Sequence, residues 1–376
     1  MYTQLDLSKV DSLRRIVFSY HNVLEFFGFD TDPIIGLDIG LTAVKVLQLS
    51  KSGDRIKVEH YAMVPLEQGV VNEKNIVDRD RVIAAIKSAI KISGISTKKV
   101  CASISNSMAI TKVLKYEAGL SDKEIGNEIE MEAGKYIPYP LTEVNLDYTV
   151  LGPVANNENL VNVLLIASKS ENVDNISGLI IESGLIPAIV DVDAYAIARA
   201  FEIVATKLPG QGKNKIIGIL DIGSNLSTLN ILDNGNIVYA REQAFGSQQL
   251  LDEIQNIYGL TYDEAILALR YETLPKDFYP EVLEPFKQSV AQQVSRFCQF
   301  FFSAGDYNSI DYIFLTGGCA NVFGLDNAIQ NKLQIKTFVA NPFDDMIISP
   351  SINREHFDYE TLRLMKCCGL ALRNII

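Results

Sequence analysis

Apolar and polar residues follow a strand-like pattern in two stretches of the chain. The first is IIGLDIGLTAVKVLQL, from Ile34 to Leu49, where an apolar run ends in Asp38 and Gly40. Apolar residues then resume, interleaved with polar ones, as in a strand with one buried face. The pattern predicts a β-hairpin whose tight glycine turn carries a carboxylate at its mouth.

The same pattern recurs in IIGILDIGSNLSTLNIL, from Ile216 to Leu232, with Asp221 and Gly223 at the end of the apolar run. A duplicated element this far along the chain indicates two related halves, each contributing one loop. The preceding LPGQGKNK, from Leu208 to Lys215, has the composition of an exposed connection and marks a boundary between them.

Helical spacing of apolar residues predicts most of the remaining elements. A helix over residues 78–95 stops at Gly94, and Ser121 with Glu124 forms a capping box at the start of another. Further helices are predicted over residues 171–184, 245–259 and 282–305, and short strands over 101–105 and 159–168. The stretch from Arg14 to Phe29 predicts an amphipathic helix packed on the body, with a membrane-surface or partner helix as the alternative.

Composition narrows the possible functions. The 376 residues are enough for two lobes, and 48% hydrophobic with 21% charged residues is an ordinary globular composition. A formal charge of −12 argues against a nucleic-acid partner. Five cysteines without a C-x-x-C pair indicate reduced cytosolic thiols, and three scattered histidines argue against a histidine triad or metal cluster. No apolar segment reaches the roughly 20 residues that span a bilayer.

The two hairpin turns suggest a phosphate-binding chemistry, although the patterns of a P-loop and of a dinucleotide fold are both missing. Two turns that face each other across a cleft would present backbone N–H groups to a phosphate chain from both sides. Gly40 and Gly223 would leave room for close approach. The side chains that could add hydrogen bonds or positive charge are Thr42, Ser224, Ser227 and Lys45.

Asp38 and Asp221 would lie near a magnesium ion and contact it through its water shell, because Mg²⁺ gives up water reluctantly. The alternative is that each Asp-Gly pair simply makes a turn. A third element favours the nucleotide interpretation. YIFLTGGCANVFGLDNAIQNKL, from Tyr312 to Leu333, predicts a strand, then Gly317 and Gly318, then a helix.

In this third element the two glycines would let adenine and ribose lie against the backbone. The helix is expected to begin near Asn321, with Phe323 as an apolar wall. Lys287 could reach the adenosine, although an exposed lysine on a helix face is the commoner explanation.

The order of these elements along the chain, two phosphate loops and then an adenosine loop, resembles the order in the actin-like ATPase superfamily, which includes actin, Hsp70, hexokinase and FtsA. A closer resemblance, from Pro33 onward, is to the PilM family of type IV pilus assembly. It is carried by the segments Cys101 to Tyr148 and Leu185 to Phe201, and by the closing CCGLALRNII. The family pattern E-A-x-x-Y-I-P-Y-P with E-V-x-L-D-Y is matched by Glu132, Ala133, Tyr136, Ile137, Pro138, Tyr139, Pro140, Glu143, Val144, Leu146, Asp147 and Tyr148.

The resemblance implies an α/β, actin-like ATPase (ribonuclease H-like) fold of two lobes, with an α/β subdomain inserted in the first. The implied parts are a helical N-terminal extension (1–32), a first lobe (33–105, 185–200 and 350–376), the inserted subdomain (106–184) and a second lobe (201–349). The implied ligands are ATP and Mg²⁺. The implied nucleotide-site residues are Asp38, Gly40, Leu41, Thr42, Lys45, Asp221, Gly223, Ser224, Asn225, Gly246, Gly317, Gly318, Asn321 and Phe323.

The sequence supports ATP hydrolysis less strongly than ATP binding, so we expect at most weak ATPase activity. Leu41 stands where the family usually has a serine and removes one hydroxyl donor, and Thr228 comes one residue later than the threonine of actin and Hsp70. By resemblance, Asp191 or Asp193 would position the attacking water. Capping of the following helix is the alternative role for these carboxylates.

The resemblance also implies a biological role. The chain would be a cytoplasmic scaffold at the inner face of the inner membrane, joined to the pilus assembly complex by the cytoplasmic N-terminal peptide of PilN. A groove of the inserted subdomain would take that peptide, and the turn placed beside it is Ile137, Pro138, Tyr139 and Pro140. The alternatives are an FtsA-like cell-division membrane anchor and a metabolic kinase of the same superfamily.

Overall fold

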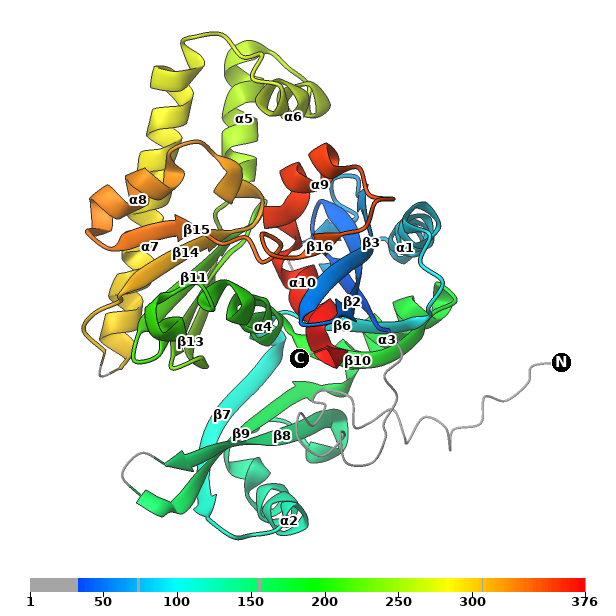
Figure 1. Cartoon of the computed structure of the whole chain (residues 1–376), viewed down its shortest axis with the longest axis vertical. Coiled ribbons are helices and arrows are strands. Elements are labelled where there is room, and N and C mark those ends of the chain that lie inside the picture. Colours follow the sequence, from blue (N-terminus) through cyan, green and yellow to red (C-terminus); the bar gives the residue numbers. More distant parts are fainter. Residues whose placement is uncertain (1–32, 73–74, 155–156, 306, 376) are drawn as a thin grey trace, which may run out of the picture. The chain divides into compact units, whose positions relative to one another are not determined.

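The computed structural model describes residues 33–72, 75–154, 157–305 and 307–375 (Figure 1). The predicted N-terminal extension and its helix lie outside these residues. The chain divides into two compact units. Of the described residues, unit 1 holds those up to Leu66, those from Asp78 to Ala196 and those from Leu370 onward, and unit 2 holds the rest.

Unit 1 is built on a mixed sheet in which five strands run in the order β10-β6-β1-β2-β3. Their bounds are β1 (Ile35–Ile39), β2 (Ala43–Ser52), β3 (Arg55–Pro65), β6 (Lys99–Ile104) and β10 (Ile186–Val192). The predicted first hairpin is confirmed, because β1 and β2 pair antiparallel with Asp38 opposite Lys45. On its other side β1 pairs parallel with β6, so the strand that carries Asp38 lies inside the sheet.

The helices of unit 1 start and stop at the predicted signals. Helix α1 (Arg79–Ser93) begins after Asp78, whose side chain accepts from the Arg81 N–H, and ends at Gly94 in the left-handed region. Helix α3 (Ser170–Glu182) packs on β6 and β10. Helix α1 packs on β2 and β3, so both helices cover the sheet of unit 1.

The inserted segment of unit 1 folds as a three-stranded antiparallel sheet in the order β7-β9-β8. Its elements are β7 (Ala109–Glu117), α2 (Asp122–Glu132), β8 (Val144–Val154) and β9 (Asn157–Lys169). The predicted capping box of Ser121 and Glu124 is present at the start of α2. Ile125 and Ile129 of α2 then pack on the sheet, and Figure 1 shows α2 beside these strands.

Unit 2 holds a second sheet in the order β13-β12-β11-β14-β15. Its strands are β11 (Ile216–Ile222), β12 (Ser227–Asp233), β13 (Asn236–Gln243), β14 (Tyr312–Thr316) and β15 (Lys336–Val339). The second predicted hairpin is confirmed by the antiparallel pairing of β11 with β12. As in unit 1, the first strand of the hairpin also pairs with a parallel strand, here β14.

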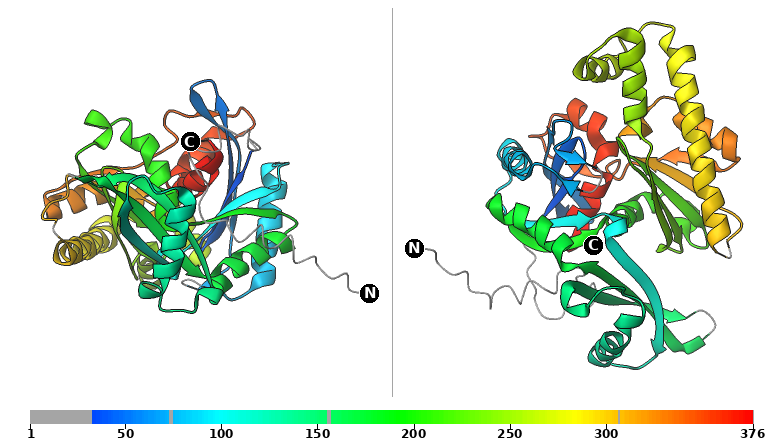
Figure 2. Two further views of the ribbon diagram at one scale, coloured as in Figure 1. Left: turned by 90° about the horizontal axis from the view of Figure 1, so that it is seen from below. Right: turned by 180° about the vertical axis from the view of Figure 1, so that it is seen from behind.

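Helices α5 (Ser247–Tyr258), α6 (Tyr262–Arg270), α7 (Glu284–Ala304) and α8 (Leu325–Leu333) belong to unit 2. Its core joins the sheet to α5 and α7 through Leu229, Ile254 and Phe297. Figure 2 shows the ribbon of the chain from two further sides. Helix α4 (Asp193–Ala205) runs from one unit into the other, and within unit 2 its Phe201 ring packs edge-on against Phe314.

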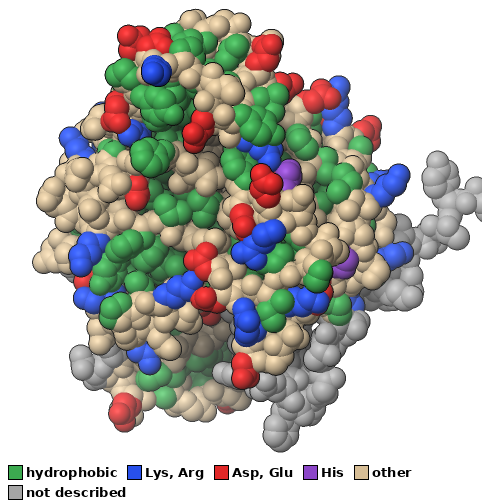
Figure 3. All heavy atoms as spheres, turned by 45° about the horizontal axis from the view of Figure 1, so that its top comes forward, with side chains coloured by type: hydrophobic (Ala, Val, Ile, Leu, Met, Phe, Trp, Pro, Cys, Tyr) green, Lys and Arg blue, Asp and Glu red, His purple; other side chains and the backbone are tan. Residues whose placement is uncertain are grey.

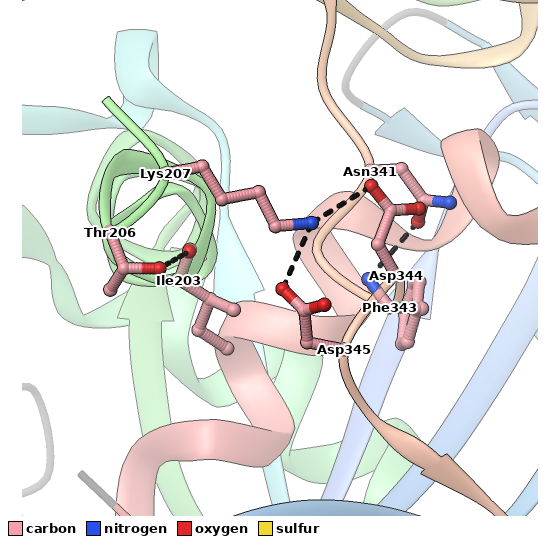
Figure 4. Close-up of polar contacts among 7 residues, drawn as sticks. All are labelled: Ile203, Thr206, Lys207, Asn341, Phe343, Asp344 and Asp345. Carbon is pink, nitrogen blue, oxygen red and sulfur yellow. Dashed lines mark hydrogen bonds and ion pairs between the residues drawn. The ribbon is translucent and has the colours of Figure 1, made fainter. Parts of the chain in front are cut away.

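The loop after β15 is held to the residues that follow α4. The Asn341 side chain accepts from the Phe343 N–H and bends the chain (Figure 4). This bend lets Lys207 Nζ pair with Asp344 at 3.1 Å and with Asp345 at 3.0 Å. Partial burial alone would lower the pKa of Lys207, but the two carboxylates outweigh it and raise the pKa.

Residues 350–369 group with unit 2, whereas the sequence placed them in the first lobe. Leu362 explains the difference, because its carbonyl accepts from the Gly317 N–H and the Thr316 hydroxyl while its side chain joins the core of unit 2. The remaining elements are β4 (Val71–Asn72), β5 (Asn75–Ile76), β16 (Ile347–Ile348), α9 (Arg354–Glu360) and α10 (Met365–Ala371). Within the described ranges, no helix has both the length and the apolar character needed to cross a bilayer.

Candidate functional site

The turn of the first hairpin gathers an aspartate, a glycine and a lysine. The Gly40 N–H donates to the Ala43 carbonyl at 3.0 Å and closes the turn. Asp38 is 2% exposed, and Lys45 Nζ lies 2.8 Å from its Oδ2. A Cβ built on Gly40 would lie 3.7 Å from Lys45 Nζ, so the ammonium group lies at the turn.

The turn of the second hairpin has the same construction. The Gly223 N–H donates to the Leu226 carbonyl at 3.1 Å, and a Cβ on Gly223 would come within 2.8 Å of that oxygen. Ser224 donates its hydroxyl to Asn225 Oδ1 at 2.7 Å. Ser227 is buried and donates to the Phe245 carbonyl, which leaves Ser224 as the hydroxyl of this turn.

Helix α5 fixes the orientation of the second turn. The Ser247 N–H donates to the Gly223 carbonyl at 3.0 Å, and the Gln248 N–H donates to the Ser224 carbonyl at 2.9 Å. A Cβ on Gly246 would overlap both carbonyl oxygens, so only glycine allows this approach. The carbonyl oxygens of the turn are therefore held toward α5.

The two central N–H groups of each turn have no acceptor within the part of the chain that the structure describes. They belong to Leu41, Thr42, Ser224 and Asn225. Successive free N–H groups in a turn form a concave site for an anion. Leu41 lacks the hydroxyl usual at its position, but its backbone N–H is still available.

The segment after β14 that the sequence predicts to contact adenosine, residues 317–324, is called the adenosine loop here, and it lies against the second turn. Gly317 has φ +87°, and a Cβ there would clash with the Asp221 carboxylate and the Ile222 carbonyl. Asp221, predicted from the hairpin, and Gly317, predicted from a segment almost a hundred residues later, are thus in contact. This contact is the structural reason for glycine at this strand end.

The rest of the adenosine loop differs in part from the expectation. After β14 the chain makes one 3-10 turn, Gly318–Asn321, and α8 begins only at Leu325. The predicted start near Asn321 is therefore wrong, because Gly324 has φ +73° and interrupts the helical path. Asn321 donates its side-chain amide to the Tyr359 carbonyl at 3.2 Å, and Phe323 is 84% exposed.

Lys287 is the residue that sequence reasoning undervalued. It is 7% exposed, so the explanation as a solvated lysine on a helix face is wrong. Its Nζ pairs with Glu284, one turn earlier on α7, and lies 3.3 Å from a Cβ built on Gly324. Arg363, which the sequence did not single out, lies beside Gly318. Two cations therefore flank the adenosine loop. The i,i+3 spacing of Glu284 and Lys287 is the feature of the sequence from which the ion pair of Lys287 could have been predicted.

The two candidate water-positioning carboxylates are both engaged. Asp191 is fully buried, and its Oδ2 faces Arg373 at 3.5 Å. Asp193 accepts from the Ser103 hydroxyl at 2.5 Å. A side chain outside α4 also bonds to its first turn, because Asn106 Oδ1 accepts from the Ala194 N–H at 2.8 Å.

The predicted partner turn is only partly available on the surface. Ile137 is 3% exposed and packs in a small core with Ala133 and Ala167, so it supports the turn from inside. Tyr139 is 40% exposed, and Lys169 Nζ lies 4.4 Å above its ring. Pro138 and Pro140 are exposed on either side of it.

Comparison with known proteins gives one family and two informative structures. The family model for type IV pilus assembly protein PilM matches residues 36–375. A solved PilM–PilN type IV pilus biogenesis complex is similar with a TM-score of 0.73 and 22% identity, over 92% of this chain and 100% of that chain. The ethanolamine utilization protein EutJ from Carboxydothermus hydrogenoformans is similar with a TM-score of 0.55 and 14% identity, over 92% and 90%. These matches confirm the predicted fold class.

Proposed function

The chain belongs to the type IV pilus assembly PilM family, and from this premise we propose that it is an ATP-binding scaffold of the pilus assembly complex. The family match favours this role over the FtsA-like anchor and the metabolic kinase. The observation that supports nucleotide binding best is the pair of matched turns, each with two N–H groups that have no acceptor among the described residues.

We propose that ATP uses these N–H groups for its phosphates and the adenosine loop for its base and ribose. Gly246 and Gly317 keep the space that side chains would fill, and Lys287 and Arg363 place positive charge beside the loop. Asp38 and Asp221 are the carboxylates that would hold Mg²⁺, which neutralises phosphate charge when bound. Since Lys45 already pairs with Asp38, contact through the water shell of the ion suits this site better than direct coordination.

Weak hydrolysis agrees with the state of the two candidate carboxylates. Asp191 is fully buried and faces Arg373, so its carboxylate is not placed to orient a water molecule. Asp193, which is partly exposed, remains the better candidate for positioning one. We expect Asp193→Ala to reduce a slow ATPase rate, measured by phosphate release, while the exposed Asp174→Ala on α3 leaves it unchanged.

Calorimetry with ATP and Mg²⁺ tests the nucleotide site. Gly246→Ala should weaken ATP binding at least tenfold, because the new methyl group displaces the Gly223 and Ser224 carbonyls. Gly134→Ala is the matched control, since a Cβ there meets nothing within 4 Å, and it should bind like wild type. Equal affinity in all three proteins, each folded by circular dichroism, would refute the proposed site.

For the partner, we propose that the inserted subdomain binds the cytoplasmic N-terminal peptide of a PilN-type protein and so places the chain at the inner face of the inner membrane. Support comes from the exposed Tyr139 and from Leu141, which is 42% exposed beside it. Calorimetry with such a peptide should show binding that Tyr139→Ala weakens. Tyr279→Ala, at a tyrosine of unit 2 that is 48% exposed, should have no effect. Absence of binding to wild type, with and without ATP, would contradict the partner assignment.

A further inference from the structure

Helix α6 of unit 2 turns apolar side chains outward. Of its nine residues only Ala265 is buried, whereas Leu267 is 51% exposed. Tyr271, directly after the helix, is 66% exposed, and Ile257 at the end of α5 is 45% exposed. Single exposed apolar residues are ordinary, but a group of them on neighbouring elements marks an interaction surface.

Leu267 and Tyr271 line an open concavity, which we call the α6 pocket. It has a volume of about 450 Å³, and its apolar walls are Tyr258, Leu260, Leu267, Tyr271, Leu274 and Pro275. A pocket of this size accepts a few apolar side chains. In Figure 3, where the top of Figure 1 is turned toward the viewer, hydrophobic side chains gather near the upper edge with acidic side chains around them.

The chain around the α6 pocket is strongly acidic. Residues 252–281 contain seven acidic residues and only two basic ones. The acidic side chains are all exposed, and they are Asp252, Glu253, Asp263, Glu264, Glu272, Asp277 and Glu281. One of the two basic residues, Arg270, lies over the Tyr359 ring at 4.5 Å and over the pocket-lining Tyr271 ring at 5.7 Å, so the excess of carboxylates is partly offset there.

The phenols of the region respond to this acidic field. Desolvation first, and then Asp277 and Glu281, raise the pKa of Tyr258, which lines the pocket. Desolvation also raises the pKa of Tyr262, with Asp263 adding to it against the opposite effect of Arg363. Asp277 and Glu281 therefore lie close enough to act on a phenol that lines the pocket.

We propose that the α6 pocket is a docking site for a partner segment that combines apolar anchor side chains with flanking lysine or arginine. The apolar walls require the anchors, and the acidic surroundings require the positive charge. An anionic membrane surface or a nucleic acid would be repelled by the same carboxylates. This site lies in unit 2, apart from the inserted subdomain proposed above for a PilN-type peptide.

Helix α5 joins the α6 pocket to the second phosphate turn. Its first turn donates to the Gly223 and Ser224 carbonyls, and its last residue, Tyr258, lines the pocket. Its 12 residues span about 18 Å at 1.5 Å per residue. A segment bound in the pocket and a phosphate bound at the turn would therefore contact two ends of one helix.

The test uses the full chain and a fluorescent 12-residue peptide with leucines three and four positions apart and lysines between them. Anisotropy should report binding that weakens at least tenfold in Leu267→Ser. Ile92→Ser, at a 68% exposed apolar residue of α1, is the matched control and should bind like wild type. The paired substitution Glu272→Lys with Glu281→Lys should weaken binding and flatten its salt dependence, whereas Glu158→Lys, in the inserted subdomain, should not.

Several results would overturn the proposal. One is equal weakening, or none, in Leu267→Ser and Ile92→Ser. A second is equally tight binding of a twin peptide with glutamates in place of the lysines. A third is binding to anionic vesicles that Leu267→Ser abolishes, since the occupant would then be a membrane. A fourth is concentration-dependent dimerisation in sedimentation that the same substitution abolishes, since the occupant would then be a second copy of this chain.

Discussion

Replacing Lys45 by methionine tests the ion pair at the first turn. The substitution keeps the length of the side chain but leaves the 2% exposed Asp38 carboxylate without the ammonium group 2.8 Å away. Removing one partner of a buried pair costs about 3–5 kcal/mol. The loss of stability has an upper limit, because Asp38 can take up a proton instead of staying charged. Protonating an ordinary aspartate costs about 1.4 kcal/mol per pH unit above 3.9, or roughly 4 kcal/mol at pH 7.

The stability that Lys45→Met loses therefore depends on pH, and the direction of this dependence can be predicted. Between pH 5 and 7 the carboxyl group of folded Lys45→Met holds a proton that the unfolded chain, with an aspartate pKa of about 3.9, does not hold, so stability rises as pH falls. We expect a loss of about 3–4 kcal/mol relative to wild type at pH 7, shrinking by about 1.4 kcal/mol per pH unit toward pH 5. Asp38→Asn combined with Lys45→Met should recover most of the loss.

Urea denaturation followed by circular dichroism at pH 7 and pH 5 measures these free energies of unfolding. Lys57→Met is the matched control, because Lys57 pairs with Glu59 at 2.7 Å but both side chains are 27% exposed. Its loss should stay below about 1 kcal/mol. The reasoning fails if Lys45→Met costs no more than Lys57→Met, or if its cost is the same at both pH values.

Three further predictions concern unit 2. Asn230 is fully buried, and its side-chain amide has no hydrogen-bond partner among the described residues. Asn230→Leu should therefore raise the free energy of unfolding, measured by urea denaturation, by about 1–3 kcal/mol. A lower free energy of unfolding would contradict this. Lys207→Met should lower the free energy of unfolding by less than about 1 kcal/mol, because Lys207 is 42% exposed, and by less still in 1 M salt. A larger loss that salt does not change would mean that Lys207 has a role beyond this ion pair. ATP with Mg²⁺ should change the affinity of the lysine–leucine peptide for the α6 pocket, and Gly246→Ala should remove the change; identical titrations with and without ATP would mean that α5 does not couple the two sites.

Local signals made both hairpins and the helix ends predictable. Asp38 and Gly40 lie two residues apart, and the turn needs only its own backbone to close. The same holds for the Ser121 capping box, whose two hydrogen bonds span three residues. Such features depend on neighbours in the sequence, so the sequence contains the information needed to place them.

Features that depend on packing were harder to predict. Ile137 belongs to a motif that reads as one surface turn, yet it is buried because Ala133 and Ala167 leave room for it beneath the sheet. The burial of Lys287 follows from the position of Gly324 in another segment. The contact of Asp221 with Gly317 joins strands that are adjacent only through sheet topology. None of these contacts leaves a periodic pattern in the chain.

Hydrogen–deuterium exchange of the two turns, with and without ATP and Mg²⁺, tests the central claim most directly. If one nucleotide uses the N–H groups of Leu41, Thr42, Ser224 and Asn225, exchange should slow in peptides that cover residues 38–45 and 221–228, and stay unchanged around Gly134. Saturating ATP that slows exchange in only one of these peptides, or in neither, would contradict the account.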